Sequence, residues 1–419
     1  MKKFLALVLV LLMIVSIASC TKNAGTKAPE DNKPATTTDK PKDVVKTAVE
    51  IKVWAAQEDQ DFVRGVADKF IAANTEFDIT INLGVVGEND AYNTFSDDPE
   101  AAADVFSFAH DQLKAFVDAG GLYEVSRNKD DVVKRNVEGS IEAASMDGKL
   151  YAYPATADNG YFLYYDKSVL SEEDVKTLDK ILEVSNAAGK RVLMHLDGNA
   201  WYVASFFFGA GNTLSLSADG KQVCEWNNAS GLAAAQAMQE FCKNPAYLNG
   251  DDGVLKGGIG GTISCGVSGT WNAADISEIL GDNYGACKLP TFTMNGKQTQ
   301  MGSFAGYKLI GVNSMITDPD KLVVAMDFAD FLTNEENQIA RFKARMLGPS
   351  NIVAASDPAV KADIALSALA DQSLYATAQK DINNDTFWPP VGAFGTAMVN
   401  KDTTDLQKLL DNMVEQVTA

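Results

Sequence analysis

Residues 51–83 read IKVWAAQEDQDFVRGVADKFIAANTEFDITINL. The apolar run over 51–54 predicts a strand, and apolar side chains then recur at helical spacing across 62–71. Over 79–83 apolar and polar side chains alternate, which is the period of a second strand. Residues 104–108 predict a third strand, before a helix that begins near Asp111. This order of strands and helices predicts right-handed βαβ units and a mostly parallel sheet.

The length of 419 residues is too great for one hydrophobic core, because domains usually hold roughly 100–200 residues. We therefore expect two α/β lobes. Ligands of such folds bind in loops beyond the carboxyl ends of the strands. The candidate ligand-binding loops that follow predicted strands are 54–59, 108–112, 154–159 and 269–272. Further elements are predicted as strands at 150–153, 161–165 and 191–195, and as helices at 231–241 and from Asp318-Pro319 to about 333.

The charge balance excludes two classes of partner. Asp and Glu number 56 against 36 Lys and Arg, giving a net charge of −20. Nucleic acid and an anionic membrane surface both require a basic face, so we expect neither as a binding partner. Only two histidines occur, His110 and His195, which leaves little material for a metal site or a His-based catalytic centre.

The N-terminus has the pattern of an export segment. Lys2 and Lys3 precede an apolar run over 4–15, and small residues then lead to Cys20. The run is shorter than the roughly 20 residues of a membrane-spanning helix. Because the segment before Cys20 resembles a bacterial lipobox, we expect residues 1–19 to be a removed signal peptide and Cys20 to carry a lipid anchor. The alternative is an ordinary cysteine within an ordinary signal peptide. Residues 20–47 then predict an anchored, flexible stalk.

Enzyme motifs are missing from the sequence. It contains no G-x-S-x-G elbow and no H-E-x-x-H, and the glycine-rich segment 257–261 lacks the lysine of a phosphate loop. Paired carboxylates could serve a glycosidase, but 56 acidic residues make such pairs easy to find by chance. We therefore expect a protein that is not an enzyme and that uses no cofactor and no metal.

Four cysteines remain after Cys20, and an exported protein sits where disulfides persist. If cysteines that follow one another in the sequence pair, the disulfides are Cys224–Cys242 and Cys265–Cys287, which is one of three possible connectivities. Free buried thiols are an equal alternative. Zinc is disfavoured because no C-x-x-C spacing occurs.

Aromatic residues in or near predicted loops are flanked by carboxylate and amide side chains. Flat indole and phenol rings match the C–H face of a sugar ring, while the polar neighbours can pair with its hydroxyl groups. Ordinary core packing is the alternative for any one of them. The residues in question are Trp54, Phe108, Trp201, Tyr202, Trp271 and Trp388.

An ordered series of segments resembles the extracellular solute-binding proteins of ABC sugar importers, and within them the maltose/maltodextrin-binding group. No single segment is decisive, but the series spans residues 50 to about 400 in the order of the family. The matching segments are 52–54, 104–111, 148–154, 163–167, 269–271, 289–292 and 304–314.

The resemblance implies a two-lobed clamp of the periplasmic-binding-protein type, each lobe a mostly parallel sheet flanked by helices. The chain would cross between the lobes three times, near Pro154, between Thr291 and Gly302, and near Gly348-Pro349. The implied lobes are 48–154 plus 303–348 for the N-lobe and 155–302 plus 349–419 for the C-lobe.

By the same resemblance, oligosaccharide binds in the cleft between the lobes, and closure of the lobes presents it to the membrane permease. This sequence departs from the family pattern at three places. Phe108 stands where the family has a tryptophan, and Gln112 stands where it has a basic residue. At 199–201 an acidic residue of the family is missing. The implied cleft residues are Trp54, Glu58, Phe108, Asp111, Asp158, Trp201 and Trp271, with Trp388 or Phe394 as the C-terminal aromatic.

The sequence thus predicts a monomeric, lipid-anchored binding protein that captures malto-oligosaccharides or a related oligosaccharide for an ABC permease. It would lie on the outer face of the cell membrane or in a periplasm. The alternatives are a lipoprotein glycoside hydrolase, a cell-surface adhesin for polysaccharide, and a binder of another solute.

Overall fold

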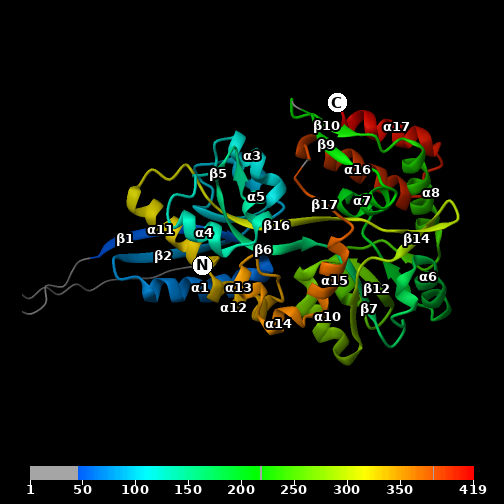
Figure 1. Cartoon of the computed structure of the whole chain (residues 1–419), viewed down its shortest axis with the longest axis horizontal. Helices are drawn as coiled ribbons and strands as arrows, with labels where there is room; N and C mark the ends of the chain where they lie inside the picture. The colour runs from blue at the N-terminus through cyan, green and yellow to red at the C-terminus, as the bar shows by residue number, and fades with distance from the viewer. Residues whose placement is uncertain (1–45, 218, 381) are drawn as a thin grey trace, which may run out of the picture. The chain divides into compact units, whose positions relative to one another are not determined.

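The computed structural model describes residues 46–217, 219–380 and 382–419 (Figure 1). The predicted signal peptide, Cys20 and nearly all of the predicted stalk lie outside the described residues. Within the described ranges, no helix combines the length and the apolar character needed to cross a membrane.

The first sheet has the order β17-β16-β3-β1-β2, and β6 also pairs with β16. Strand β1 is parallel to both β2 and β3, as the sequence predicts, whereas β16 runs antiparallel to β3 and β6. The strands are β1 (Thr47–Ala55), β2 (Phe77–Val85), β3 (Val105–Ala109), β6 (Ala152–Gly160), β16 (Ser303–Val312) and β17 (Ala376–Ala378).

Helices surround this sheet and close the first hydrophobic core, which draws on residues 49–155 and 309–332. Helix α11 begins at Pro319 because the Asp318 side chain accepts hydrogen bonds from the backbone N–H groups of Asp320 and Lys321. The helices are α1 (Gln60–Ala73), α2 (Ala91–Asp97), α3 (Leu113–Asp118), α4 (Lys129–Arg135), α5 (Glu138–Ala143), α11 (Pro319–Leu332) and α12 (Glu335–Arg345).

The second sheet has the order β11-β8-β12-β7-β13. Strand β8 is parallel to β11 and β12, whereas β7 is antiparallel to β12 and β13. The strands are β7 (Phe162–Asp166), β8 (Arg191–Leu193), β11 (Tyr247–Leu248), β12 (Ile263–Ser268) and β13 (Tyr284–Cys287). Its helices are α6 (Leu178–Ala187), α7 (Ala200–Gly209), α8 (Ala229–Lys243), α9 (Asp252–Gly258), α10 (Ala273–Leu280), α15 (Ile364–Ser373), α16 (Asn384–Val399) and α17 (Leu406–Val417).

The smaller described elements are short strands and helices in the connections. They are β4 (Ser145–Met146), β5 (Lys149–Leu150), β9 (Leu214–Leu216), β10 (Gln222–Cys224), β14 (Thr291–Met294), β15 (Lys297–Gln300), α13 (Ile352–Ala355) and α14 (Pro358–Lys361). Single 3-10 turns, labelled η, are η1 (Gln57–Asp59), η2 (His110–Gln112), η3 (Asp174–Lys176), η4 (Thr270–Asn272) and η5 (Gly281–Asn283).

The two-lobed α/β fold is confirmed, with one difference in the sheets. Both are mixed rather than mostly parallel. In the first sheet β16 is antiparallel to β3 and to β6, which lies beside it in Figure 1, and in the second β7 is antiparallel to β12 and β13. The remaining hydrophobic clusters draw on 161–304 and 365–417. The lobe boundaries and the crossing points given above stay predictions.

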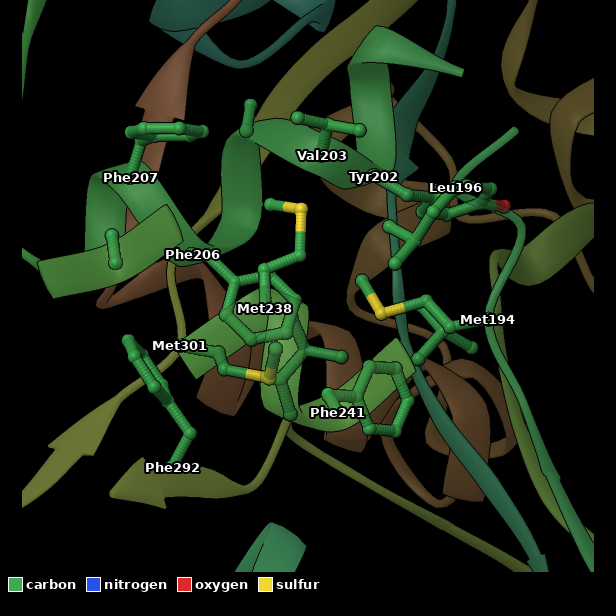
Figure 2. Packing of buried hydrophobic residues seen from close by; sticks show 14 of the residues in the cluster. Met194, Leu196, Tyr202, Val203, Phe206, Phe207, Met238, Phe241, Phe292 and Met301 are labelled. Carbon is green, nitrogen blue, oxygen red and sulfur yellow. The ribbon is translucent and has the colours of Figure 1, made fainter. Parts of the chain in front are cut away.

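The core of the second lobe is built around α7. Figure 2 shows Phe206 of α7 among Met238 and Phe241 of α8, Phe292 of β14 and Met301. The Phe206 ring lies 5.2 Å from that of Phe292 and 6.1 Å from that of Phe241, measured between centroids. The helix that carries Trp201 at its first turn is therefore anchored by large buried side chains at its other end.

The suggested disulfides are wrong: Cys224, Cys242, Cys265 and Cys287 are free thiols. Cys265 in β12 and Cys287 in β13 pair with opposite edges of β7, so they lie about two strand spacings apart, roughly 10 Å, beyond disulfide reach. Cys224 precedes α8 and Cys242 lies near its other end, about 20 Å of helix away. Burial raises the pKa of all four thiols to about 12.

Candidate functional site

A cavity of about 1560 Å³ is lined by loops of both lobes. From the first lobe come segments that follow β1, β2 and β3, namely 56–58, 85–93 and 111–119. From the second come segments that include 195–202 after β8, 251–253 before and within α9, and Trp271 after β12. The cavity thus lies largely at strand ends, where ligands bind in such folds.

Five of the residues expected in the cleft line this cavity: Glu58, Asp111, Trp201, Trp271 and Trp388. They come from separate parts of the chain, and the fold brings them together. Tyr202, whose ring was also considered, lines the cavity as a buried residue at the first turn of α7.

Four expected residues lie outside the cavity. Phe108 is 0% exposed, with its ring 4.9 Å from that of Phe116, so it packs in the first core and has no face for a ligand. Phe394 is 4% exposed and packs against Phe207, which leaves Trp388 as the C-terminal aromatic of the cavity. Trp54 lies over Gly84 of the neighbouring strand, with its ring 6.0 Å from that of Phe106.

Asp158, the fourth, is 2% exposed and joins three segments of the chain. Its Oδ2 atom accepts hydrogen bonds from the Thr270 hydroxyl at 2.7 Å and from the backbone N–H of Gly348 at 2.6 Å. This carboxylate therefore ties β6 to η4 and to the chain after α12, and acts as a structural connection rather than a cavity wall.

Each tryptophan of the cavity has its indole N–H bonded to a side-chain oxygen. Because an indole has a single donor, the ring faces and edges are what remains for a ligand. The Trp201 and Trp271 rings lie 5.6 Å apart at 37°. The three acceptors are Gln379 Oε1 for Trp201 at 3.0 Å, Asp252 Oδ2 for Trp271 at 2.8 Å, and Asn384 Oδ1 for Trp388 at 2.8 Å.

Trp271 is held from two sides. Asp252, at the start of α9, fixes its indole with one carboxylate oxygen and accepts a hydrogen bond from the Ser268 hydroxyl with the other, at 2.8 Å. The ring also lies against Gly269, where an added Cβ atom would be 1.9 Å from it. Glycine is therefore required at 269, because any larger residue would displace the platform.

Trp201 is placed by the start of α7. The Asn199 side chain caps the helix by accepting from the backbone N–H of Tyr202 at 3.3 Å. The Tyr161 hydroxyl donates to the backbone carbonyl of Trp201 at 2.8 Å, and the two rings meet edge to face at 4.6 Å. The Asn199 cap thus orients the first turn of α7, and this places the Trp201 ring at the cavity.

Asp111 is the carboxylate with the most perturbed environment in the cavity. Burial raises its pKa to about 6, against a smaller lowering by a hydrogen bond from the Gln379 side chain. Its Oδ1 atom is buried and has no hydrogen-bond partner among the residues that the structure describes. A buried acceptor left unpaired is costly, so this atom is suited to receive a ligand hydroxyl group.

His110, next to Asp111, supports the loop. Its Nδ1 atom accepts a hydrogen bond from the backbone N–H of Tyr307 at 3.2 Å, and burial lowers its pKa to about 4. The ring does not line the cavity.

Lys308 lines the cavity but was missed by sequence reasoning. Its ammonium group lies 3.5 Å from the Glu88 carboxylate and 5.8 Å from the centre of the Trp271 ring. Burial lowers its pKa, but the surrounding carboxylates, Glu88 first, raise it above the usual range overall. The sequence indication that was available is a single charged residue, Lys308, within the mostly apolar strand β16.

Gln379 and Asn384 were missed as well, since they lie where the sequence predicts no element. Their place at the cavity becomes visible only in the structure, through hydrogen bonds with residues from distant segments of the chain.

Comparison with known proteins agrees with this architecture. A galactooligosaccharide-binding protein of Bacillus subtilis (strain 168) is 28% identical over 384 residues, which is 87% of this chain and 88% of that protein. A solved structure with acarbose is 29% identical with a TM-score of 0.79, covering 88% of this chain and 98% of that one. The Thermus thermophilus maltotriose-binding protein with bound maltotriose shares the fold, at 19% identity, a TM-score of 0.74, and coverage of 88% and 99%.

Residues 66–368 match the family model described as bacterial extracellular solute-binding protein. The matched segment contains strands of both sheets, though not β1 or β17, and most of the residues that line the cavity. The chain therefore belongs to the bacterial extracellular solute-binding protein family.

Proposed function

We propose that this protein is the oligosaccharide receptor of an ABC importer. It captures its ligand in the cavity between the lobes and delivers it to membrane permease subunits. The observation that carries the proposal is the set of three tryptophans whose indole N–H groups are already bonded, together with the Asp111 carboxylate, whose buried Oδ1 atom has no partner among the described residues. Ring faces and an unpaired acceptor suit the C–H faces and hydroxyl groups of a sugar.

The ligand is an oligomer rather than a single sugar. A cavity of about 1560 Å³ exceeds the roughly 300–1,000 Å³ of ordinary small-molecule pockets. The named relatives bind galacto-oligosaccharides and maltotriose, so these two classes of neutral oligosaccharide are the first candidates. We also propose that the protein is monomeric and is attached through Cys20 to the cell membrane, facing outward or into a periplasm.

A thermal-shift panel should identify the ligand class. A ligand that binds only the folded state stabilises it by RT ln(1 + [L]/Kd), about 2.7 kcal/mol at 100 times Kd, which raises the melting temperature by a few degrees. We expect this rise with maltotriose or with β-1,4-galactotriose, and none with glycine or glutamate. A rise with the amino acids alone would contradict the proposal.

Oligosaccharide affinity should depend on pH through Asp111. A hydroxyl group donates more strongly to a carboxylate than to a carboxylic acid, so binding favours the ionised form. With a folded-state pKa of about 6, Asp111 is protonated below that pH and ionised above it. We therefore expect affinity to fall about tenfold between pH 7.5 and pH 5 and to level off above pH 7.

Calorimetric titration across this pH range measures the effect. The control is Asp111→Asn, which should bind more weakly at every pH and give a flat profile. A wild-type profile as flat as that of the variant would contradict the role given to Asp111.

A further inference from the structure

Glu88 and Lys308 form an ion pair in the wall of the cavity. The Lys308 ammonium group lies 3.5 Å from the Glu88 carboxylate, and the two side chains are only 13% and 12% exposed. Glu88 belongs to the loop that follows β2, whereas Lys308 lies within β16. Two charged groups from distant parts of the chain are therefore taken largely out of water at a wall that a ligand can reach.

The ion pair leaves most of the hydrogen-bonding capacity of both groups unused. An ammonium group has three N–H donors, and a carboxylate has two acceptor oxygens. The separation of 3.5 Å exceeds the roughly 2.7–2.9 Å of a hydrogen-bonded ion pair, and neither charged group has a hydrogen bond with another residue of the described ranges. Because a buried ion pair repays its lost hydration only where further hydrogen bonds satisfy it, this pair is suited to polar groups that a ligand brings.

The loop that carries Glu88 is fixed by Gln112, a buried residue of η2. The Gln112 Nε2 atom donates to the backbone carbonyl of Glu88 at 2.6 Å, and its Oε1 atom accepts from the backbone N–H of Tyr92 at 2.9 Å. The backbone N–H of Ala109 donates to the same Glu88 carbonyl at 3.3 Å. The end of β3 and η2 thus hold the backbone of Glu88, which limits the positions that its carboxylate can take.

The sheet is irregular at Lys308. This residue pairs with Thr156 of β6, and the register between β6 and β16 shifts on both sides of the pair. Such irregularities redirect side chains and are frequent next to active sites. The ammonium group lies 5.8 Å from the centre of the Trp271 ring. A sugar unit that stacks on Trp271 would therefore bring its hydroxyl groups close to Lys308.

We propose that Glu88 and Lys308 bind one unit of the oligosaccharide through two neighbouring hydroxyl groups. The Glu88 carboxylate accepts a hydrogen bond from one hydroxyl group, and the Lys308 ammonium donates to the oxygen of the next. The pair thereby selects a sugar unit with two free adjacent hydroxyl groups and sets its orientation at Trp271. The inference rests on the proposed function in taking an oligosaccharide as the ligand.

A purely structural ion pair is the alternative, and substitutions separate the two roles. Lys308→Met and Glu88→Gln each keep the length of the side chain and remove one charge, which leaves the other charge unpaired. The double variant Glu88→Gln with Lys308→Met leaves no unpaired charge. The control is the same double change at Glu183 and Lys180, an exposed ion pair of α6 at 3.0 Å.

Calorimetric titration with maltotriose and with β-1,4-galactotriose compares these proteins. For the sugar that the wild type binds, we expect each single variant to lower the affinity about tenfold, the loss typical of a hydrogen bond to a charged group. The double variant should lose at least as much, because neither charge remains, whereas the control stays within twofold of wild type. Wild-type affinity in the double variant would make the pair purely structural and overturn the inference.

Analogues of the same sugar that each lack one hydroxyl group test for direct contact. In the wild type, removal of the hydroxyl group that faces Lys308 should lower the affinity about tenfold. Lys308→Met should bind that analogue as tightly as it binds the complete sugar, because the contact is already lost. If Lys308→Met discriminates against every analogue as strongly as the wild type does, Lys308 does not touch the ligand and the inference is overturned.

The outcomes distinguish this inference from the proposed function. If the wild type binds neither sugar, the proposed function fails and the inference fails with it. If the wild type and the double variant bind one sugar equally tightly, the proposed function stands and the inference alone fails. A circular-dichroism melt without sugar checks that each variant is folded, and the analogue series with Lys308→Met decides the matter if the double variant does not fold.

Discussion

Replacement of Trp271 by alanine is expected to lower oligosaccharide affinity by about 100-fold, ~2.7 kcal/mol, while the protein stays folded. Trp271 provides the ring that faces Trp201 at 5.6 Å and that lies 5.8 Å from the Lys308 ammonium group. Its truncation removes the stacking face and frees Asp252 Oδ2 from its indole donor. Calorimetric titration of wild type and variant measures the loss.

The matched control is Trp271→Phe, which keeps an aromatic face but has no N–H for Asp252. We expect it to lose much less affinity than the alanine variant, because stacking rather than hydrogen bonding carries the contact. A circular-dichroism melt checks that both variants fold. Unchanged affinity of a folded Trp271→Ala protein would remove Trp271 from the site.

Replacement of Phe206 by alanine is expected to cost about 3–5 kcal/mol of unfolding free energy, the range for a buried phenylalanine. Phe206 is 0% exposed and lies among Phe241, Phe292 and two methionines of the second core (Figure 2). Removal of its ring leaves a cavity that close-packed neighbours cannot fill. Urea unfolding followed by circular dichroism measures the change.

A stability control is Val223→Ala, at an exposed position of β10. It should change the unfolding free energy by no more than about 0.5 kcal/mol. Because Phe206 anchors the helix that carries Trp201, its loss should also weaken sugar binding. A Phe206→Ala protein with wild-type stability would show that the core is not arranged around α7 as described.

Much of the fold could be predicted from hydrophobic period alone. The strand at 79–83 and the helix at 62–71 bury one side against a common core, so their side-chain spacing is visible in the sequence. The start of α11 at Asp318-Pro319 could be predicted equally well, because the hydrogen bonds that cap the helix join residues close together in the sequence. The antiparallel direction of β16 was not, because it depends on pairing with β3 and β6 from far earlier in the chain.

The cavity was predictable only in part. Trp201 and Trp271 combine an aromatic ring with a position in or near a predicted loop, which identifies them as candidates from the sequence. Phe108 shares the same description, yet the clustering of Phe95, Phe106 and Phe116 draws it into the core. Aromatic residues after strands therefore predict both ligand platforms and core, and tertiary packing decides between them.

The disulfide suggestion failed for a related reason. Sequence distance placed Cys265 and Cys287 in neighbouring strands, but β7, from residues 162–166, inserts between them. The insertion of an earlier strand into a sheet cannot be read from local spacing. Gln379 and Asn384 were not predicted as cavity residues for the same reason. Their hydrogen-bond partners are Trp201 for Gln379, and Asp111 and Trp388 for Asn384, and the fold brings these partners to them.

Calorimetric titration of the wild-type protein with maltotriose and β-1,4-galactotriose, followed by chromatography of the recovered sugar, tests the central claim most directly. We predict saturable binding of one molecule of at least one of these sugars, and recovery of that sugar at its original length. Absence of binding with both, or recovery of shortened chains, would contradict an oligosaccharide receptor.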